Sequence, residues 1–395
     1  MKKKIKKAFT LVELLVVIAI LAILATVSIV GYNSFTNKAK ISVDQQAVAQ
    51  MNTVLQADEV LNGVPESIDK VADLLIENGY SDKFQTYYSK HTIGWLKEKN
   101  SIVLIEDASK ITYPESLSNY PVSNVITFTV NIVTDSKTLL DSLNSASSMA
   151  VGYTNIILSN DISLQERATF SVSDNMTVAI DLNGKSITSE HKTFRIDGNG
   201  RCDIKNGTIV APQPETISES KDPSYCVGIF GNSTVTIENC NLIAGAYGIA
   251  TNGSSSKGTK VIMKNCTVDS NVSFYSPAGE WNVENCTFKR TSVICGGNVT
   301  MNKCTFNCDP NRKAYTDEEI KNNYGRGDGA QDCGDALLVL NRRSSGYEFT
   351  SLKITNSTFN GNENLYSLRI IDMEAENATS AKIDIGSSNT FNGKK

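Results

Sequence analysis

The sequence predicts an α+β N-terminal part, one long α-helix with a small antiparallel sheet, followed by an all-β solenoid. Residues 9–62 contain no proline and only one glycine, Gly31, which favours a continuous helix. From residue 124 to 395, short strand patterns alternate with turn residues. Within that second region a unit containing Asn-Cys-Thr recurs about every 20 residues, as in solenoid proteins.

A basic stretch and then an apolar stretch open the chain. Residues 2–7 are lysine except for Ile5, and residues 14–30 are apolar except for Thr26 and Ser28. A helix of about 20 apolar residues spans a bilayer, and flanking lysines stay on the cytoplasmic side. The sequence therefore predicts a single pass through the cytoplasmic membrane.

Glu13 stands at the start of this apolar run, where an unpaired charge in lipid costs roughly 2.5 kcal/mol or more. The carboxylate therefore needs a cationic partner. A plain secretory signal or signal anchor is the alternative interpretation. It would need a pair of small residues for cleavage, and no Ala-x-Ala pair occurs between residues 19 and 29.

Residues 8–14, Ala-Phe-Thr-Leu-Val-Glu-Leu, resemble the processing site of type IV pilins and type II secretion pseudopilins. The resemblance implies that a prepilin peptidase cleaves between Ala8 and Phe9 and that Phe9 is then N-methylated. It also implies that Glu13, the fifth mature residue, pairs with the N-terminal amine of a neighbouring subunit during assembly. Ala8 departs from the family, which usually has Gly there. Other pilin subunits are thus the expected partners, and an extracellular pilus is the expected location after assembly.

Four segments follow from this organisation. They are a leader (1–8), a long pilin helix with a transmembrane N-terminal half (9–62), a small α+β head (63–123) and a β domain (124–395). In the long helix, Val48, Met51 and Leu55 form an apolar face suited to the core of the head.

The head is loosely similar to the heads of Gram-positive pilins. A helix is expected at 67–76, strands at 93–96 and 101–105, and a closing segment at 111–115. His91 is expected at the surface, because no second metal ligand lies near it in the sequence.

The β domain begins with a predicted strand at 125–130 and a capped helix at 138–143. After these, the repeats follow. In a solenoid, equivalent residues stack about 4.8 Å apart. One predicted column is an asparagine ladder at a turn, where Asn tolerates left-handed backbone: Asn206, Asn239, Asn265, Asn285 and Asn356. Just inside it, packed thiols form a second column: Cys240, Cys266, Cys286 and Cys304. Disulfides between successive coils are the alternative for these cysteines.

The repeats and the segment 177–184 resemble right-handed parallel β-helices of the pectate-lyase-like group, many of which cleave polysaccharides. An enzyme would need paired carboxylates, or a base with nearby cations, facing a sugar. The sequence contains no catalytic signature of that group, so we expect no enzymatic activity. Trp281 occupies an interior position of its repeat and is expected in the core, although exposed aromatic side chains could instead stack on sugar rings.

The segment from 309 to 335 is the longest insertion between repeats. Three of its carboxylates lie among glycines, and oxygen ligands of this kind could hold Ca²⁺: Asp328, Asp332 and Asp335. The spacing is not that of a known calcium loop, so no cofactor is expected and these residues stay the weaker candidates for a metal site.

The function expected from the sequence is that of a minor or tip pilin-like subunit whose β domain binds a glycan or a cell surface. Two alternatives stay open: a tethered polysaccharide lyase or hydrolase, and a type II secretion pseudopilin. Nucleic acid is not an expected partner, because the net charge is −4 and the only basic cluster is in the leader.

Overall fold

The computed structural model describes residues 11–80, 84–212, 224–251, 253–276, 278–324, 333–341, 343–344, 347–372 and 382–394. The chain divides into two compact units. Unit 1 contains residues 1–66 and 70–127, and unit 2 contains residues 67–69 and 128–395. The main division therefore lies between residues 127 and 128, close to residue 124, where the β domain is expected to begin. We call residues 128–395 the β body.

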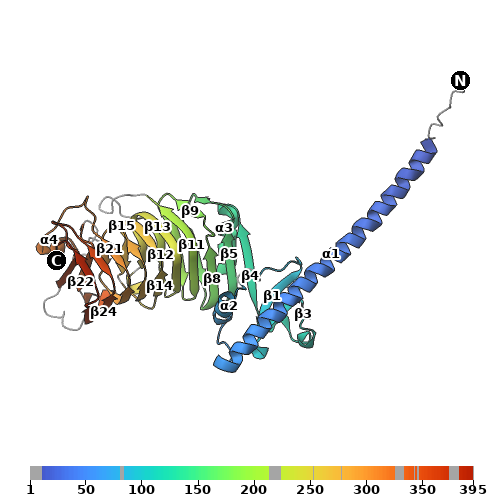
Figure 1. Ribbon diagram of the computed structural model, residues 1–395, viewed down its shortest axis with the longest axis horizontal. Helices are drawn as coiled ribbons and strands as arrows, with labels where there is room; N and C mark the ends of the chain where they lie inside the picture. Colours follow the sequence, from blue (N-terminus) through green and yellow to red (C-terminus); the bar gives the residue numbers. More distant parts are fainter. Residues whose placement is uncertain are drawn as a thin grey trace, which may run out of the picture. The chain divides into compact units, whose positions relative to one another are not determined.

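Unit 1 is built on the helix α1 (Leu11–Asn62), which is 52 residues long (Figure 1). The side chains of Val48, Met51 and Leu55 are fully buried. Asn52 fixes this helix to strand β2 (Ser101–Glu106), because its Oδ1 accepts a hydrogen bond from the Ile102 backbone N–H at 2.6 Å. An apolar stripe and one amide thus hold the helix against a sheet.

The sheet of unit 1 is antiparallel, with strand order β4–β1–β2–β3, and the start of β4 (Val125–Val133) forms its edge. Its other elements are α2 (Ile68–Glu77), β1 (His91–Leu96), β2 (Ser101–Glu106), β3 (Lys110–Tyr113) and the 3₁₀ turns Lys97–Lys99, Glu115–Leu117 and Val122–Asn124. The small antiparallel sheet lies close to where the strand patterns predict it.

His91 is not at the surface as expected. Its side chain is 3% exposed, and its Nδ1 lies 3.3 Å from Asp44 Oδ2. The same carboxylate accepts hydrogen bonds from the backbone N–H groups of Tyr87 and Tyr88 at 2.7 and 3.1 Å. A buried carboxylate with three donors thus ties this segment to α1, a contact that local pattern could not indicate.

The β body consists of strands that pair in parallel from coil to coil (Figure 1). The first series is β4 (Val125–Val133), β5 (Val151–Leu158), β8 (Asn175–Asp181), β11 (Arg201–Ala211), β13 (Thr234–Thr251), β14 (Lys260–Lys264), β17 (Glu280–Glu284), β20 (Gly297–Asn302), β24 (Tyr347–Thr355) and β27 (Lys382–Ile385).

The second series comprises β6 (Ile162–Leu164), β9 (Ser186–Ser189), β11, β13, β15 (Thr267–Val272), β18 (Thr287–Phe288), β21 (Thr305–Asn307), β25 (Thr358–Asn360) and β28 (Thr390–Asn392). The third comprises β7 (Ala168–Val172), β10 (Lys192–Gly198), β12 (Tyr225–Ile229) and β13, followed by β16 (Phe274–Ser276), β19 (Ser292–Ile294), β22 (Leu337–Asn341) and β26 (Leu368–Asp372). Smaller elements are the 3₁₀ turn Gly253–Ser256, α4 (Asp317–Tyr324) and β23 (Arg343–Ser344).

This pairing is consistent with the predicted β-solenoid, while its right-handed sense stays a prediction. Alternation of apolar and polar residues decides which side chains face the interior. In β17, Trp281 and Val283 are buried whereas Glu280, Asn282 and Glu284 are exposed.

The interior is closed at its first coil by helix α3 (Ser136–Ser147). Asp135 caps this helix, because its carboxylate accepts the backbone N–H of Thr138 at 2.8 Å. Leu139, Leu143 and Ala146 of α3 belong to the same buried cluster as the interior of the coils. The helix therefore covers apolar side chains that no preceding coil covers.

Candidate functional site

Three residues of the N-terminal segment, Ala8, Phe9 and Glu13, are expected from the sequence to serve processing and assembly. Ala8 and Phe9 lie outside the described residues. Glu13 lies in the first turn of α1 as the structure describes it. Large apolar side chains around Glu13, from Leu11 to Leu24, are 45–76% exposed. A helix that is apolar on every side needs a membrane or other helices to cover it.

Across the described residues, no helix is long and apolar enough to meet the criteria for a membrane span. The expected span, 14–30, includes residue 25 and residues 27–30, whose side chains lie outside the described set.

The five asparagines of the expected ladder all adopt left-handed backbone, with φ between 51° and 62°. Their amides connect successive coils. Asn239 Nδ2 donates to Asn206 Oδ1 at 3.2 Å, Asn265 Nδ2 to Asn239 Oδ1 at 3.1 Å, and Asn285 Nδ2 to Asn265 Oδ1 at 2.8 Å. A residue that tolerates positive φ and also carries a donor and an acceptor suits this position.

In the coil after Asn285, the turn position of the ladder is occupied by lysine and not by asparagine. Lys303 adopts the left-handed backbone, with φ 55°, in the coil after Asn285. The next amide, Asn356 Nδ2, donates at 2.9 Å to Asn302 Oδ1, one residue earlier. At the first coil of the ladder, Asn206 Nδ2 donates to Asp181 Oδ1 at 3.1 Å. The repeat alignment missed Asn302 and Asp181, although each lies within two residues of the aligned turn.

A second amide ladder was missed altogether. Asn360 Nδ2 donates to Asn307 Oδ1 at 2.9 Å, and Asn392 Nδ2 to Asn360 Oδ1 at 2.8 Å. The preceding phenylalanines, Phe306 and Phe359, stack with ring centroids 4.9 Å apart. The recurring tripeptide Thr-Phe-Asn, at residues 305, 358 and 390, is the sequence signal that could have revealed this ladder.

The four cysteines of the expected inner column are buried free thiols, as are most of the other cysteines. Each donates to a carbonyl of its own turn, as Cys266 does to Lys264 O at 3.2 Å. Gly207 occupies the equivalent place in β11, in register with Cys240. A Cβ at Gly207 would lie 2.4 Å from Leu182 Cβ, so a cysteine does not fit in that coil.

Burial raises the pKa of two thiols in this column, Cys240 and Cys304, which predicts loss of stability at alkaline pH. From an ordinary value of 9.0, the pKa of Cys240 rises to about 12 and that of Cys304 to about 11. The folded state then binds more protons than the unfolded state above about pH 9. Their contribution is fully present below that pH and is lost as the pH rises towards 11 and 12. We expect each thiol to lower the free energy of unfolding by up to about 1.4 kcal/mol per pH unit in this window.

Urea unfolding at pH 8 and at pH 10.5 tests this expectation. The fluorescence of Trp281 reports on the β body when Trp95, the only other tryptophan, is replaced by Phe. The control is the double variant Cys240→Ser and Cys304→Ser, because the column already contains a serine, Ser357, whose hydroxyl accepts from the Cys304 backbone N–H. The variant should show a shallower pH dependence. Equal pH dependences would contradict a role for these thiols.

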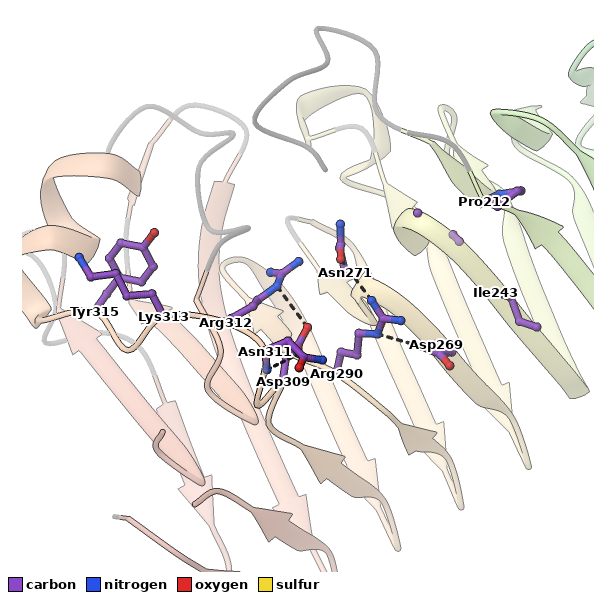
Figure 2. Close-up of a pocket in the computed structure, with 12 residues that line it drawn as sticks. Pro212, Ile243, Asp269, Asn271, Arg290, Asp309, Asn311, Arg312, Lys313 and Tyr315 are labelled. Atoms are coloured by element: carbon purple, nitrogen blue, oxygen red, sulfur yellow. Dashed lines mark hydrogen bonds and ion pairs between the residues drawn. The ribbon is translucent and has the colours of Figure 1, made fainter. Parts of the chain in front are cut away.

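A polar cleft lies on the outside of the β body (Figure 2). Its volume is about 600 Å³. Its lining comes from Pro212, the segment 243–245 of β13, Asp269 and Asn271 of β15, Arg290 between β18 and β19, and Asp309, Asn311, Arg312, Lys313 and Tyr315 after β21. The insertion that follows β21 thus forms one side of the cleft, and four preceding coils form the other.

Ion pairs dominate the cleft. Arg290 Nε lies 3.0 Å from Asp269 Oδ1, and Arg312 Nε lies 3.2 Å from Asp309 Oδ2. Figure 2 shows the two pairs near one another. Lys313 Nζ lies 3.0 Å from Glu319 Oε1 and 4.9 Å from the ring centre of Tyr315. No local motif predicts this site, because its members are brought together only by stacking of the coils.

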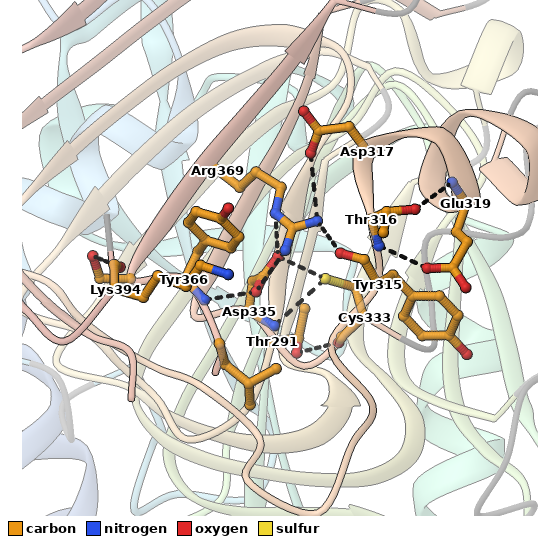
Figure 3. Close-up of polar contacts among 12 residues, drawn as sticks. Thr291, Tyr315, Thr316, Asp317, Glu319, Cys333, Asp335, Tyr366, Arg369 and Lys394 are labelled. Atoms are coloured by element: carbon orange, nitrogen blue, oxygen red, sulfur yellow. Dashed lines mark hydrogen bonds and ion pairs between the residues drawn. The ribbon is translucent and has the colours of Figure 1, made fainter. Parts of the chain in front are cut away.

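Of the calcium candidates, Asp328 and Asp332 lie outside the described residues. Asp335 is fully buried, and its carboxylate binds protein donors through both oxygens (Figure 3). Arg369 Nε lies 2.9 Å from Oδ2, and the backbone N–H of Tyr366 donates to Oδ1 at 2.8 Å. Arg369 also donates to the Tyr315 carbonyl at 2.7 Å. Asp335 therefore anchors the insertion through an interior ion pair.

No group of three His, Cys, Asp or Glu side chains in the described part of the chain could hold a metal ion.

Comparison with known proteins identifies the start of the chain. Residues 3–29 match the family model described as the prokaryotic N-terminal methylation motif. No curated protein and no solved structure is significantly similar to the chain. The motif is the type IV pilin-type prepilin signal, which supports a pilin-like or pseudopilin secreted subunit. It implies processing by a prepilin peptidase and assembly with other pilin subunits.

Proposed function

We propose that this chain is a minor or tip subunit of a type IV pilus, inserted in the cytoplasmic membrane before assembly and displayed outside the cell afterwards. The observation that carries the proposal is the methylation motif at residues 3–29. It is supported by Glu13 in the first described turn of a 52-residue helix whose apolar side chains are exposed between Leu11 and Leu24. Such a helix supplies both membrane anchorage and a surface for other subunits.

The β body gives this subunit its particular role, which we propose to be adhesion through a surface or glycan. Much of the chain lies in this unit, which has an extensive core of its own. A lateral domain of that size would crowd a closely packed shaft, which favours a sparse or terminal position in the filament. The cleft beside β15 supplies polar side chains suited to contact with a polar surface.

Mass spectrometry of filaments sheared from cells tests the proposal. We expect a mature N-terminus at Phe9 carrying one N-methyl group, and β-body peptides at far lower abundance than those of the major subunit. Detection of the intact leader 1–8 in the filament would contradict the processing step. If the methylated protein is found only in cell envelopes that also contain a secretion system, the pseudopilin alternative is the better one.

A second candidate, a tethered polysaccharide-cleaving enzyme, is favoured by the two carboxylates in the cleft. Against it, the carboxylates of Asp269 and Asp309 are each already engaged by an arginine side chain. Incubation with pectic and related glycans, followed by measurement of chain length, distinguishes the two candidates. Release of shorter chains that stops after Asp309→Asn would favour the enzyme.

A further inference from the structure

The cleft has the size and composition of a ligand site. Its volume, about 600 Å³, lies within the range found for small-molecule sites. Pro212, Ile243 and Tyr315 give it apolar surface, and charged or amide side chains give it hydrogen-bonding groups. A ligand with both C–H faces and many hydroxyls, as in a sugar ring, matches this mixture.

The polar groups of the cleft are held in place before any ligand arrives. Arg290 is fixed at three points: its Nε contacts Asp269, its Nη1 donates to Asn271 Oδ1 at 3.4 Å, and its backbone N–H donates to Ser273 Oγ at 3.2 Å. On the other side, Asp309 Oδ1 accepts the backbone N–H of Asn311 at 3.1 Å. Preorganisation of this kind lowers the entropy that binding must otherwise cost.

The charges of the cleft argue for an uncharged ligand. Each of its three cations has a carboxylate within 3.2 Å: Asp269 for Arg290, Asp309 for Arg312 and Glu319 for Lys313. An anionic ligand at Arg290 or Arg312 would lie near the carboxylate that the arginine already contacts, and that carboxylate would repel it. A hydroxyl avoids this repulsion, because it can accept from a guanidinium and donate to a carboxylate at the same time.

We infer that this cleft binds a short neutral oligosaccharide, with Arg290, Asp269 and Asp309 as the groups that bind its hydroxyls. The inference rests on the proposed adhesive role of the β body and gives that role a site and a ligand class. Tyr315 forms an apolar wall, because it packs against a buried cluster that includes Ile320 of α4.

The test uses the whole processed chain in detergent micelles and an array of neutral oligosaccharides, with uronic acid oligosaccharides of equal length as the charged counterparts. We expect binding of at least one neutral glycan, with little difference between low and high salt, because the ligand itself carries no charge. Binding confined to uronic acid glycans, or no binding of any neutral glycan, would overturn the inference.

The matched variants are Arg290→Met and Arg195→Met. Arg290→Met removes the guanidinium but leaves Asp269 with Lys289, whose Nζ lies 3.5 Å away, so the fold should persist. Arg195 forms a comparable pair with Asp197, at 2.9 Å, in β10 and outside the cleft. We expect Arg290→Met to weaken glycan binding about tenfold and Arg195→Met to leave it unchanged. Equal binding by Arg290→Met and the unmodified chain would also overturn the inference.

Incorporation of the same variants into filaments is measured separately. Arg290→Met should enter filaments as the unmodified chain does. Loss of glycan binding with normal incorporation therefore reports on the cleft alone. Absence of the unmodified chain from filaments would contradict the proposed function, and the glycan measurement would still decide whether the cleft binds a neutral oligosaccharide.

Discussion

Replacing Glu13 by Ala is expected to lower incorporation into filaments by more than about tenfold while leaving cleavage after Ala8 largely intact. The expected cleavage site is the Ala8–Phe9 bond, five residues before Glu13, so the substitution spares the bond that the peptidase is expected to cut. In the assembled state, however, the expected partner of the carboxylate is the N-terminal amine of a neighbouring subunit. A charge pair in an apolar surrounding is strong, and its loss leaves that amine unpaired, at a cost of several kcal/mol.

The control for this variant is Asp58→Ala, which removes a carboxylate from the same helix well beyond the apolar run. Asp58 accepts a hydrogen bond from Asn62, four residues away, so it serves α1 locally. Immunoblots of sheared filaments and of whole cells measure incorporation and cleavage together. Normal amounts of the Glu13→Ala subunit in filaments would show that the pairing is not needed for assembly.

Local chemistry was sufficient to predict the parts of the fold that repeat. Asn favours left-handed backbone at a turn. The spacing of the Asn-Cys-Thr units therefore predicted which asparagines stack in successive coils. The departures were harder to foresee. Lys303 takes the same backbone without an amide, and Asn356 of the following coil bonds to Asn302. Gly207 replaces a cysteine because Leu182 leaves no space.

The contacts that sequence could not predict join residues far apart in the chain. Asp44 meets His91 only because a loop returns to α1. Asp335, at the end of the insertion, meets Arg369 of β26. The cleft combines Asp269, Arg290 and Asp309, which belong to successive coils and share no motif. The periodicity of the repeats predicts which residues stack in successive coils. The lengths of the insertions decide which other residues pack against the outside of those coils.

The largest effect expected from a single turn residue is that of Asn265→Ala. Asn265 has φ 53° and lies in the middle of the ladder, where its amide donates to Asn239 and accepts from Asn285. Alanine would lose both hydrogen bonds, about 0.5 to 1.5 kcal/mol each. It would also have to adopt left-handed backbone, which costs a residue with a Cβ about 1–2 kcal/mol. Because part of that strain is already present with Asn, we expect a loss of about 2–3 kcal/mol in the free energy of unfolding.

Two companion variants separate these contributions. Asn265→Gly loses the amide but adopts positive φ freely, so it should lose about 1 kcal/mol less than Asn265→Ala. Lys303→Asn should instead gain about 1 kcal/mol, because Asn suits the φ of 55° at that position and can donate to Asn285. Urea unfolding followed through Trp281, with Trp95 replaced by Phe, measures all three. If the Ala and Gly variants unfold at the same urea concentration, hydrogen bonding between coils, and not backbone geometry, is what selects asparagine for this column.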